Sequence, residues 1–382
     1  MQREPADSPV AGHDRDDDDG QGVEGTALCM SGGGYRAMLF HVGALWRLNE
    51  LGRLPGLDRV SSVSGGSITA ATLALGWNAL GFDARGVAAN FESRLVAPVR
   101  GLAGRTIDRS SILGGLLTPR TTIADKVAAA YRKHLFGDAT LQDLPDQPRF
   151  VLNATNVQTG SLFRFSKPYM ADYRIGRVMA PDVDLAVAVA ASSAFPPVLS
   201  PLRLKVERPW TGRGELQRPP YTTDVVLSDG GVYDNLGLET AWKRHRTILV
   251  SDGGGQMAPQ PEPEHDWARH SFRINGLIDN QVRSLRKRQT VAGFQRGDRD
   301  GAYWGIRSHA ADYGPPDGSL PCPPEQTLAL AETRTRLEAM PAERQERLIN
   351  WGYAVCDVAM RRWVAPEAAR PERFPYPDRG VG

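Results

Sequence analysis

The chain has 382 residues, 41% of them hydrophobic, and includes eight Trp, which is enough apolar material for a sizeable core. Its length allows one large α/β domain or two smaller domains. The formal net charge is only +2, from 46 basic and 44 acidic residues, so overall charge gives no reason to expect a nucleic-acid partner. Attraction to an anionic surface would have to come from a local patch.

The three cysteines, Cys29, Cys322 and Cys356, are widely spaced and form no C-x-x-C pair. This pattern indicates neither a zinc site nor a disulfide framework, and it fits a reducing compartment. The opening M-Q-R-E-P-A-D lacks the layout of a secretory signal, and no apolar stretch is long enough to span a bilayer. We therefore predict a cytoplasmic protein, with peripheral membrane contact left open.

The first 80 residues predict a polar tail followed by two strand–turn–helix units. Residues 1–25 are polar and acidic, which predicts a disordered N-terminal tail. The apolar run 26–30 predicts a strand that leads through S-G-G-G into a helix ending near Asn49. Residues 59–63 predict a second strand, followed by a sharp turn and a helix over 67–80. This alternation predicts a parallel α/β sheet with helices on both faces.

Residues 81–136 support two interpretations. Their middle part is rich in Gly and Arg with scattered apolar residues, which is typical of a flap that meets lipid. The alternative, which we favour, is a loop and helix packed on the core.

The rest of the chain predicts further strands and helices. Strands are predicted at 149–155, 161–166, 225–228 and 247–251, with helices at 184–191, 235–245, 271–294, 324–339 and 342–362. The helix at 271–294 is amphipathic and carries Arg283, Arg286, Lys287 and Arg288 near its end. These cations could attract anionic headgroups, but we favour a solvated face.

The first loop of chemical interest is S-G-G-G at 31–34. Three glycines between a strand and a helix let the backbone turn tightly and expose its N–H groups beside the positive end of the helix dipole. Such a loop can stabilise an oxyanion or hold a phosphate. The following Tyr35-Arg36-Ala37 fits neither the dinucleotide nor the P-loop template. Taken alone, the loop is most simply a tight structural turn.

Two further loops follow strands and carry potential catalytic groups. Ser64, between a strand and a helix and followed by Gly65 and Gly66, has the form of a nucleophile elbow, although Ser62 stands where the pattern usually has Gly. Asp229, followed by Gly230 and Gly231, can act as a base or as an orienting group, although an Asp in such a turn is commonly structural.

The three loops are more informative together than singly. Each is predicted at the carboxyl end of a strand, which is where ligands bind in open α/β sheets. A nucleophile, an oxyanion loop and an acid that converge on one crevice meet the requirements of acyl transfer.

Four blocks in this chain resemble those of the patatin-like phospholipase family. They are S-G-G-G-Y-R at 31–36, S-V-S-G-G at 62–66, A-S-S-A-F-P-P at 191–197 and D-G-G-V-Y-D-N at 229–235. The first block is also similar to that of the cytosolic phospholipase A group. The resemblance covers about residues 26–250, and the C-terminal third matches no family that we can name.

The resemblance implies a fold and a domain organisation. The fold is α/β, with three layers and a mainly parallel central sheet flanked by helices. We expect the acidic tail at 1–25, a patatin-like catalytic domain at 26–255 with a candidate flap at 81–136, and a mostly helical C-terminal extension at 256–382 packed on the same domain.

The resemblance also implies a hydrolase that cleaves acyl esters of lipids through a Ser–Asp dyad. Ser64 would attack the ester, and Asp229 would accept its proton and later activate water. The N–H groups of Gly33, Gly34 and Gly65 would form the oxyanion hole. Arg36 would brace the loop or meet a lipid phosphate. Ser192 to Pro196 would shape the floor of the pocket, and Asp234 and Asn235 would form the far side of the acid loop. Support for these loops is assigned to Gly32, Arg36, Gly66, Gly230 and Gly231.

Several alternatives remain open. His245, His265, His270 or His309 could complete a triad, but ordinary core or surface roles are favoured for them, as core packing is for His41. No cofactor and no metal site are expected. The partners expected are an acyl lipid or phospholipid, and the oligomeric state is not indicated. An acyltransferase with the same dyad, or an inactive lipid-binding protein, would carry much of the same pattern.

Overall fold

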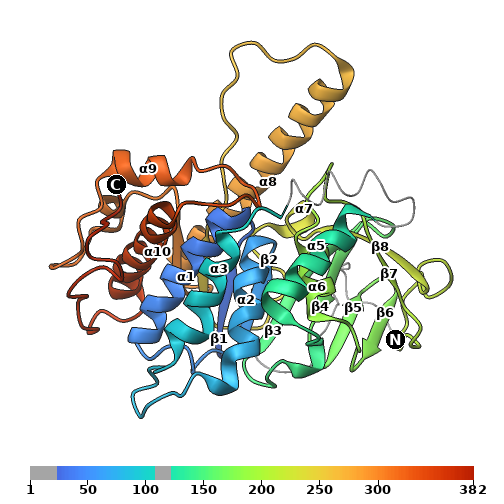
Figure 1. The fold of residues 1–382 in the computed structure, drawn as a ribbon, viewed down its shortest axis with the longest axis horizontal. Coiled ribbons are helices and arrows are strands. Elements are labelled where there is room, and N and C mark those ends of the chain that lie inside the picture. The colour runs from blue at the N-terminus through green and yellow to red at the C-terminus, as the bar shows by residue number, and fades with distance from the viewer. Residues whose placement is uncertain (1–23, 108–121) are drawn as a thin grey trace.

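The computed structural model describes residues 24–107 and 122–382, which are built on a ten-stranded mixed sheet (Figure 1). Five strands run parallel in the order β10-β9-β1-β2-β3. From β3 the sheet continues antiparallel through β4, β5 and β6, and β8 pairs with both β3 and β7. The α/β fold with a parallel sheet centre is therefore confirmed.

The elements have the following bounds. The parallel strands are β1 (Thr26–Met30), β2 (Arg59–Val63), β3 (Arg149–Asn156), β9 (Thr247–Asp252) and β10 (Asp300–Gly305). The antiparallel strands are β4 (Ser161–Phe165), β5 (Tyr169–Asp172), β6 (Gly176–Met179), β7 (Leu202–Lys205) and β8 (Asp224–Asp229). The helices are α1 (Gly34–Glu50), α2 (Gly65–Gly76), α3 (Ala97–Ala103), α5 (Ile123–Tyr131), α6 (Leu185–Ser192), α7 (Gly231–Asp234), α8 (Trp267–Arg296), α9 (Pro324–Ala331) and α10 (Ala342–Trp363). Short 3-10 or π turns occupy Trp77–Ala79, Glu92–Val96, Arg132–Phe136, Leu141–Asp143 and Ala310–Tyr313.

The sheet is apolar on both faces because alternate side chains of its central strands enter different cores. In β1, Leu28 and Met30 enter the main core with α1, α2 and α10, whereas Ala27 and Cys29 enter a smaller core. That smaller core is closed by residues 236–241, and Phe294 of α8 packs against it. Burial on both faces explains why the strand reads as an uninterrupted apolar run.

Strand β10 and helix α10 both attach the C-terminal region to the fold. Strand β10, which the sequence analysis did not predict, extends the parallel sheet beside β9, so the region is not purely helical. Helix α10 lies against α1, as the red and blue helices of Figure 1 show. The two helices approach closely because Gly43 of α1 faces the Ile349 carbonyl, and Gly352 of α10 faces the Phe40 carbonyl.

We expect Gly43→Ala to destabilise the protein by about 3 kcal/mol, because the added methyl would collide with the backbone of α10. Urea unfolding measures the loss. Gly101→Ala in α3 is the matched control, since a Cβ there would meet no neighbouring atom of the described residues within 4 Å. Equal stability of the two variants would contradict the close helix crossing.

Two predicted helices are corrected by the structure. Residues 235–245 form successive turns, because the Asp234 carboxylate accepts the Leu236 and Glu239 N–H groups and Gly237 adopts φ +71°. The helix predicted at 324–339 ends at Ala331, since the carbonyls of Thr333 and Arg336 instead accept hydrogen bonds from Arg36 and Tyr35.

Two predictions concern segments that the structure does not describe, or describes only in part. The tail at 1–25 is described only from residue 24, and the candidate flap at 81–136 includes residues 108–121. Both therefore stay predictions. Among the described helices, none combines the length and apolar character needed to cross a membrane.

Candidate active site

Ser64 lies at a strained turn between β2 and α2. Its backbone has φ +52° and ψ −119°, a conformation that residues other than glycine rarely adopt. A Cβ at Gly66 would lie 2.6 Å from the Met30 carbonyl oxygen, so glycine is required for α2 to pass this close to β1. The turn therefore has the geometry of a nucleophile elbow.

A chain of buried hydroxyl groups supports this turn. The Ser192 hydroxyl accepts the Ser64 N–H at 3.0 Å and donates to the Asn153 carbonyl at 2.6 Å. The Ser67 hydroxyl lies 2.8 Å from that of Ser192 and 3.0 Å from that of Ser62. Ser62, the departure from the usual glycine, thus contributes a satisfied buried group and does not disrupt the elbow.

We expect Ser192→Ala to lower the free energy of unfolding by about 2 kcal/mol, because the buried Ser64 N–H would lose its acceptor. Thermal or urea unfolding checks the loss. Ser193→Ala removes the neighbouring hydroxyl, which bonds to Val189 and Tyr131 and not to the elbow. Reactivity of Ser64 should fall in Ser192→Ala and persist in Ser193→Ala; the same reactivity in both would contradict a supporting role for Ser192.

Ser64 and Asp229 meet because two strands end against the same edge of β3. Strand β2 runs parallel to β3, and its last residue pairs with Asn153. Strand β8 runs antiparallel to β3, and Asp229 pairs with the next residue, Ala154. Since β4 occupies the other edge of this part of β3, β2 and β8 must approach end to end. Their carboxyl ends therefore bring the serine and the aspartate together.

Asp229 is a buried carboxyl group whose pKa is raised to about 7, mainly because burial disfavours its charge. The Gly231 N–H, which donates to Oδ1 at 2.7 Å, and the Ser64 hydroxyl oppose this rise, while the charge of Asp279 on α8 adds to it. Oδ2 has no partner of normal hydrogen-bond geometry among the described residues. The arrangement leaves one carboxylate oxygen free beside Ser64, in a group poised to exchange protons near neutral pH.

The glycine loop lies directly against the elbow. Gly33 and Gly34 have φ values of +147° and +60°, and a Cβ on Gly65 would collide with the Gly34 carbonyl. In the part of the chain that is described, no acceptor is found for the N–H groups of Gly33, Gly34 or Gly65. These three N–H donors, next to the Ser64 turn, could stabilise a negatively charged oxygen on a substrate bound at Ser64, as an oxyanion hole does.

Asn235 connects the glycine loop with the aspartate loop. Its carbonyl accepts the Gly32 N–H at 3.2 Å, and a Cβ on either Gly32 or Gly231 would lie 2.6 Å from its side-chain oxygen. Gly230 also lies too close to a neighbour for a side chain, because a Cβ there would collide with the Asn153 carbonyl oxygen. The sequence placed Asn235 only on the far side of the acid loop; its bridging position depends on the turn after α7.

Arg36 braces the glycine loop from behind. Its buried guanidinium donates two bonds of 3.2 Å to the Gly253 carbonyl and one of 2.5 Å to the Thr333 carbonyl, and burial lowers its pKa to about 10. The Tyr35 N–H donates to the Arg336 carbonyl at 3.0 Å. Of the two roles predicted for Arg36, these contacts favour bracing over phosphate binding. No sequence signal indicated that Arg336 or Asp279 would approach the site.

The histidines occupy other positions. His41 is buried between Ser251 and the Ser31 carbonyl, and burial lowers its pKa to about 4. His245 is buried with a similarly lowered pKa, whereas His265, His270 and His309 are exposed. No hydrogen bond joins a histidine to Ser64 or Asp229 within residues 24–107 and 122–382. His41 holds the glycine loop and β9 together, in agreement with the packing role expected for it.

The described residues contain no group of three or more His, Cys, Asp or Glu side chains that could hold a metal ion. A pocket of about 340 Å³ is lined by ten described residues between 329 and 344. They include Arg336, which contacts the glycine loop, but not Ser64 or Asp229. Both of those side chains are themselves buried.

A family model for patatin-like phospholipases matches residues 28–242, which is more than half of the chain. The chain belongs to the patatin-like phospholipase family. The matched range includes the glycine loop, the elbow and Asp229, and it ends before α8. No curated protein matches the chain.

Three solved structures resemble this patatin-like chain. Human GIVD cytosolic phospholipase A2 is 14% identical, covers 87% of this chain and 60% of its own, and has a TM-score of 0.48. VipD from Legionella pneumophila is 14% identical, with coverages of 87% and 66% and a TM-score of 0.36. The type III effector protein ExoU is 15% identical, with coverages of 90% and 54% and a TM-score of 0.32. This chain spans less than two thirds of each of those chains.

Proposed function

We propose that the chain is a serine hydrolase that cleaves acyl esters of lipids, with Ser64 as nucleophile and Asp229 as its general base. The proposal rests above all on the end-to-end meeting of β2 and β8, which sets a strained serine beside a buried carboxylate with one free oxygen. Membership of the patatin-like phospholipase family supports the lipid ester as substrate.

In the first half-reaction, Asp229 Oδ2 takes the proton of the Ser64 hydroxyl as Oγ bonds to the acyl carbon. The carbonyl oxygen becomes negative, and the N–H groups of Gly33, Gly34 and Gly65 stabilise it. When the carbonyl re-forms, the bond to the alcohol breaks, and that alcohol leaves with the proton held by Asp229. The acyl group remains on Ser64.

In the second half-reaction, Asp229 takes a proton from water as the hydroxide bonds to the acyl carbon. Collapse of this intermediate releases the fatty acid and returns the proton to Ser64 Oγ. The raised pKa of Asp229 suits both steps, since one group must accept and donate a proton near neutral pH. Arg36, which braces the loop, and Gly32, Gly66, Gly230 and Gly231, which allow the close approaches, support this geometry.

The proposal includes a cytoplasmic location with peripheral membrane contact. Cys29, Cys322 and Cys356 are free thiols, which suits a reducing compartment.

We expect a fluorophosphonate probe to label wild-type protein at Ser64 and to leave Ser64→Ala unlabelled, because the probe requires an activated serine. Mass spectrometry of the adduct identifies the site. Ser93→Ala, which removes an exposed serine, is the control and should label normally. Labelling that persists in Ser64→Ala, or folded wild-type protein that never labels, would contradict the assignment.

A separate product analysis distinguishes a hydrolase from an acyltransferase. With an added alcohol acceptor, a hydrolase should release free fatty acid, whereas formation of a new ester would indicate an acyltransferase.

A further inference from the structure

Helix α8 presents its apolar side chains to solvent. Figure 1 shows this 30-residue helix and the loop before it rising from the body of the fold. Ile274, Leu277, Ile278, Val282 and Leu285 have exposed fractions between 40% and 52%, and Trp267 at the start of the helix is 84% exposed. A continuous apolar face of this kind on a folded protein indicates an interaction surface.

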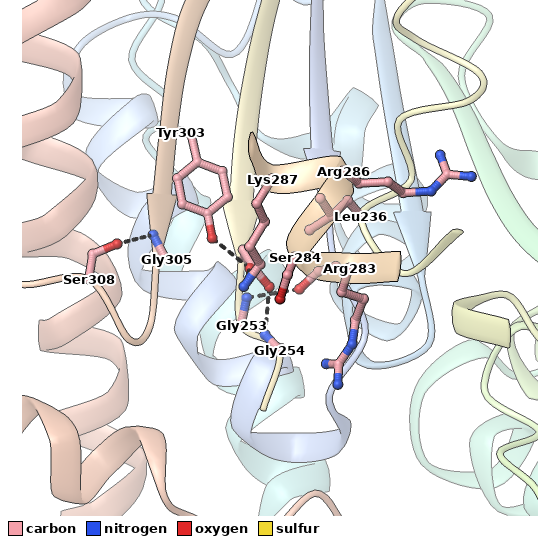
Figure 2. A network of polar contacts seen from close by, with 12 residues as sticks. Leu236, Gly253, Gly254, Arg283, Ser284, Arg286, Lys287, Tyr303, Gly305 and Ser308 are labelled. Carbon is pink, nitrogen blue, oxygen red and sulfur yellow. Dashed lines mark hydrogen bonds and ion pairs between the residues drawn. The ribbon is translucent and has the colours of Figure 1, made fainter. Parts of the chain in front are cut away.

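The opposite, polar side of α8 holds the helix to the protein. Lys287 forms an ion pair of 2.5 Å with Asp252 at the end of β9, and Tyr303 of β10 donates to the same carboxylate at 2.7 Å. Arg286 pairs with Glu239 at 3.1 Å, and Arg283 donates to the Gly255 carbonyl at 2.9 Å. Figure 2 shows Lys287 and Tyr303 pointing toward one another, with Arg283 descending beside Gly254.

These contacts fix which face of α8 is outward. Three of the four cations at 283–288, for which the sequence favoured a solvated face, bind the body of the protein; only Arg288 is exposed. Further along, Thr290 and Gly293 are buried against the body. Rotating the helix to bury Ile278 and Leu285 would break these ion pairs, so the apolar face stays outward in the isolated protein.

The charge of α8 favours an anionic lipid surface as its partner. The helix contains seven Arg or Lys residues against one acidic residue, Asp279. Five of the seven are ion-paired within the protein, and Arg273 and Arg288 are the two for which no ion pair is found among the described residues. Apolar side chains on one face and an excess of cations are the features of helices that lie in the membrane interface.

The residue pattern fits a second copy of the chain less well. A coiled-coil seam through Ile274, Ile278 and Leu285 would also contain Ser271, Gln281 and Arg288, so alternate positions along it are polar.

We propose that the outward face of α8, defined by Ile274, Leu277, Ile278, Val282 and Leu285, docks on an anionic phospholipid bilayer with the helix parallel to its surface. The inference rests on the proposed function for its setting, because an enzyme that cleaves bilayer lipids must first reach them. Since Arg286 of the same helix pairs at 3.6 Å with Asp234, in the loop that follows Asp229, docking through α8 would hold the aspartate loop near the lipid.

The test is co-sedimentation with vesicles made of equal parts phosphatidylcholine and phosphatidylserine. Ile278→Asp/Leu285→Asp should lower the partition coefficient at least about tenfold relative to wild type, because two apolar side chains that would enter the bilayer are replaced by charges that the anionic lipid repels. Asn275→Asp/Ser284→Asp adds the same charge at exposed polar positions of the same helix, and it should bind more than Ile278→Asp/Leu285→Asp. Circular dichroism verifies that both variants are folded.

Three outcomes would overturn the inference: wild-type protein that does not sediment with the vesicles, equal binding by the two double variants, or a wild-type dimer in light scattering that Ile278→Asp/Leu285→Asp dissociates. Hydrolysis of a water-soluble short-chain ester by wild-type protein, without vesicles, tests the proposed function separately. Vesicle binding without hydrolysis would support the docking surface and contradict the proposed enzyme activity. Hydrolysis without vesicle binding would support the activity and contradict the docking surface.

Discussion

Asp229→Asn should lower kcat for ester hydrolysis about 10⁴-fold, because the amide can neither take the proton of Ser64 nor return it. Asparagine keeps the size of the side chain and an oxygen for the Gly231 N–H, so the loop should stay in place. In wild-type protein, kcat/KM should rise with pH through an apparent pKa of about 7, since only the ionised carboxylate acts as a base. Steady-state rates between pH 5 and pH 9 measure both effects.

The same substitution should stabilise the protein at alkaline pH. The pKa of Asp229 is raised from 3.8 to about 7 in the folded state, so the folded protein holds a proton that the unfolded chain releases. Wild-type stability from this group is therefore lost as pH rises from about 4 to about 7, and it stays low above that. Each pKa unit corresponds to about 1.4 kcal/mol, so the advantage of Asp229→Asn should grow by about 3 kcal/mol between pH 5 and pH 9.

Urea unfolding at the two pH values measures this advantage. Asp224→Asn, at the exposed first residue of the same strand, is the matched control and should retain wild-type activity. An Asp229→Asn variant that keeps a tenth of the activity would exclude the residue as the base. A stability difference that does not change with pH would show that its carboxyl group is not held in a raised-pKa environment.

Gly65→Ala should lower kcat by about 10²–10³-fold, the effect of losing an oxyanion donor, with a smaller change in KM. Its methyl group would collide with the Gly34 carbonyl and lie 3.0 Å from the Gly34 nitrogen. The glycine loop and the elbow would have to separate, which would misplace the N–H groups of both residues. Overpacking should also cost about 1–3 kcal/mol of stability.

Gly101→Ala is again the control for this change, because at this helical glycine an added Cβ would contact nothing within 4 Å in the described parts of the chain. It should leave kcat unchanged and raise stability by about 0.5–1 kcal/mol through the better helix propensity of alanine. Steady-state kinetics of both variants with one soluble ester measure these changes in kcat and KM. Wild-type kcat in Gly65→Ala would contradict an oxyanion role for these donors.

The sequence by itself determined the local parts of the candidate site. The strands at 26–30 and 59–63 were predicted with the bounds that the structure has, because apolar runs bounded by glycine turns have few other conformations. The same glycines marked the close approaches of Gly33, Gly34, Gly65 and Gly66, since only glycine fits where backbones touch. Four blocks in order were enough to indicate the family.

Only the tertiary structure decided how these parts combine. The sequence cannot show that β8 runs antiparallel to β3 and meets β2 end to end, because strand direction depends on contacts between distant residues. The raised pKa of Asp229 requires burial and the approach of Asp279, neither of which has a local signal. The turns at 235–245 arose because the Asp234 side chain captured backbone N–H groups that a helix would have used.

In helix α8, too, the sequence determined the element and the tertiary structure decided how it is oriented. Its periodicity predicted a helix at 271–294, and the structure has one at Trp267–Arg296. Periodicity separates two faces but does not say which one is outward. Asp252 and Glu239, which lie far away in the sequence, bind Lys287 and Arg286 and thereby turn the apolar face to solvent. Local propensity therefore fixed the helix, and long-range ion pairs fixed its orientation.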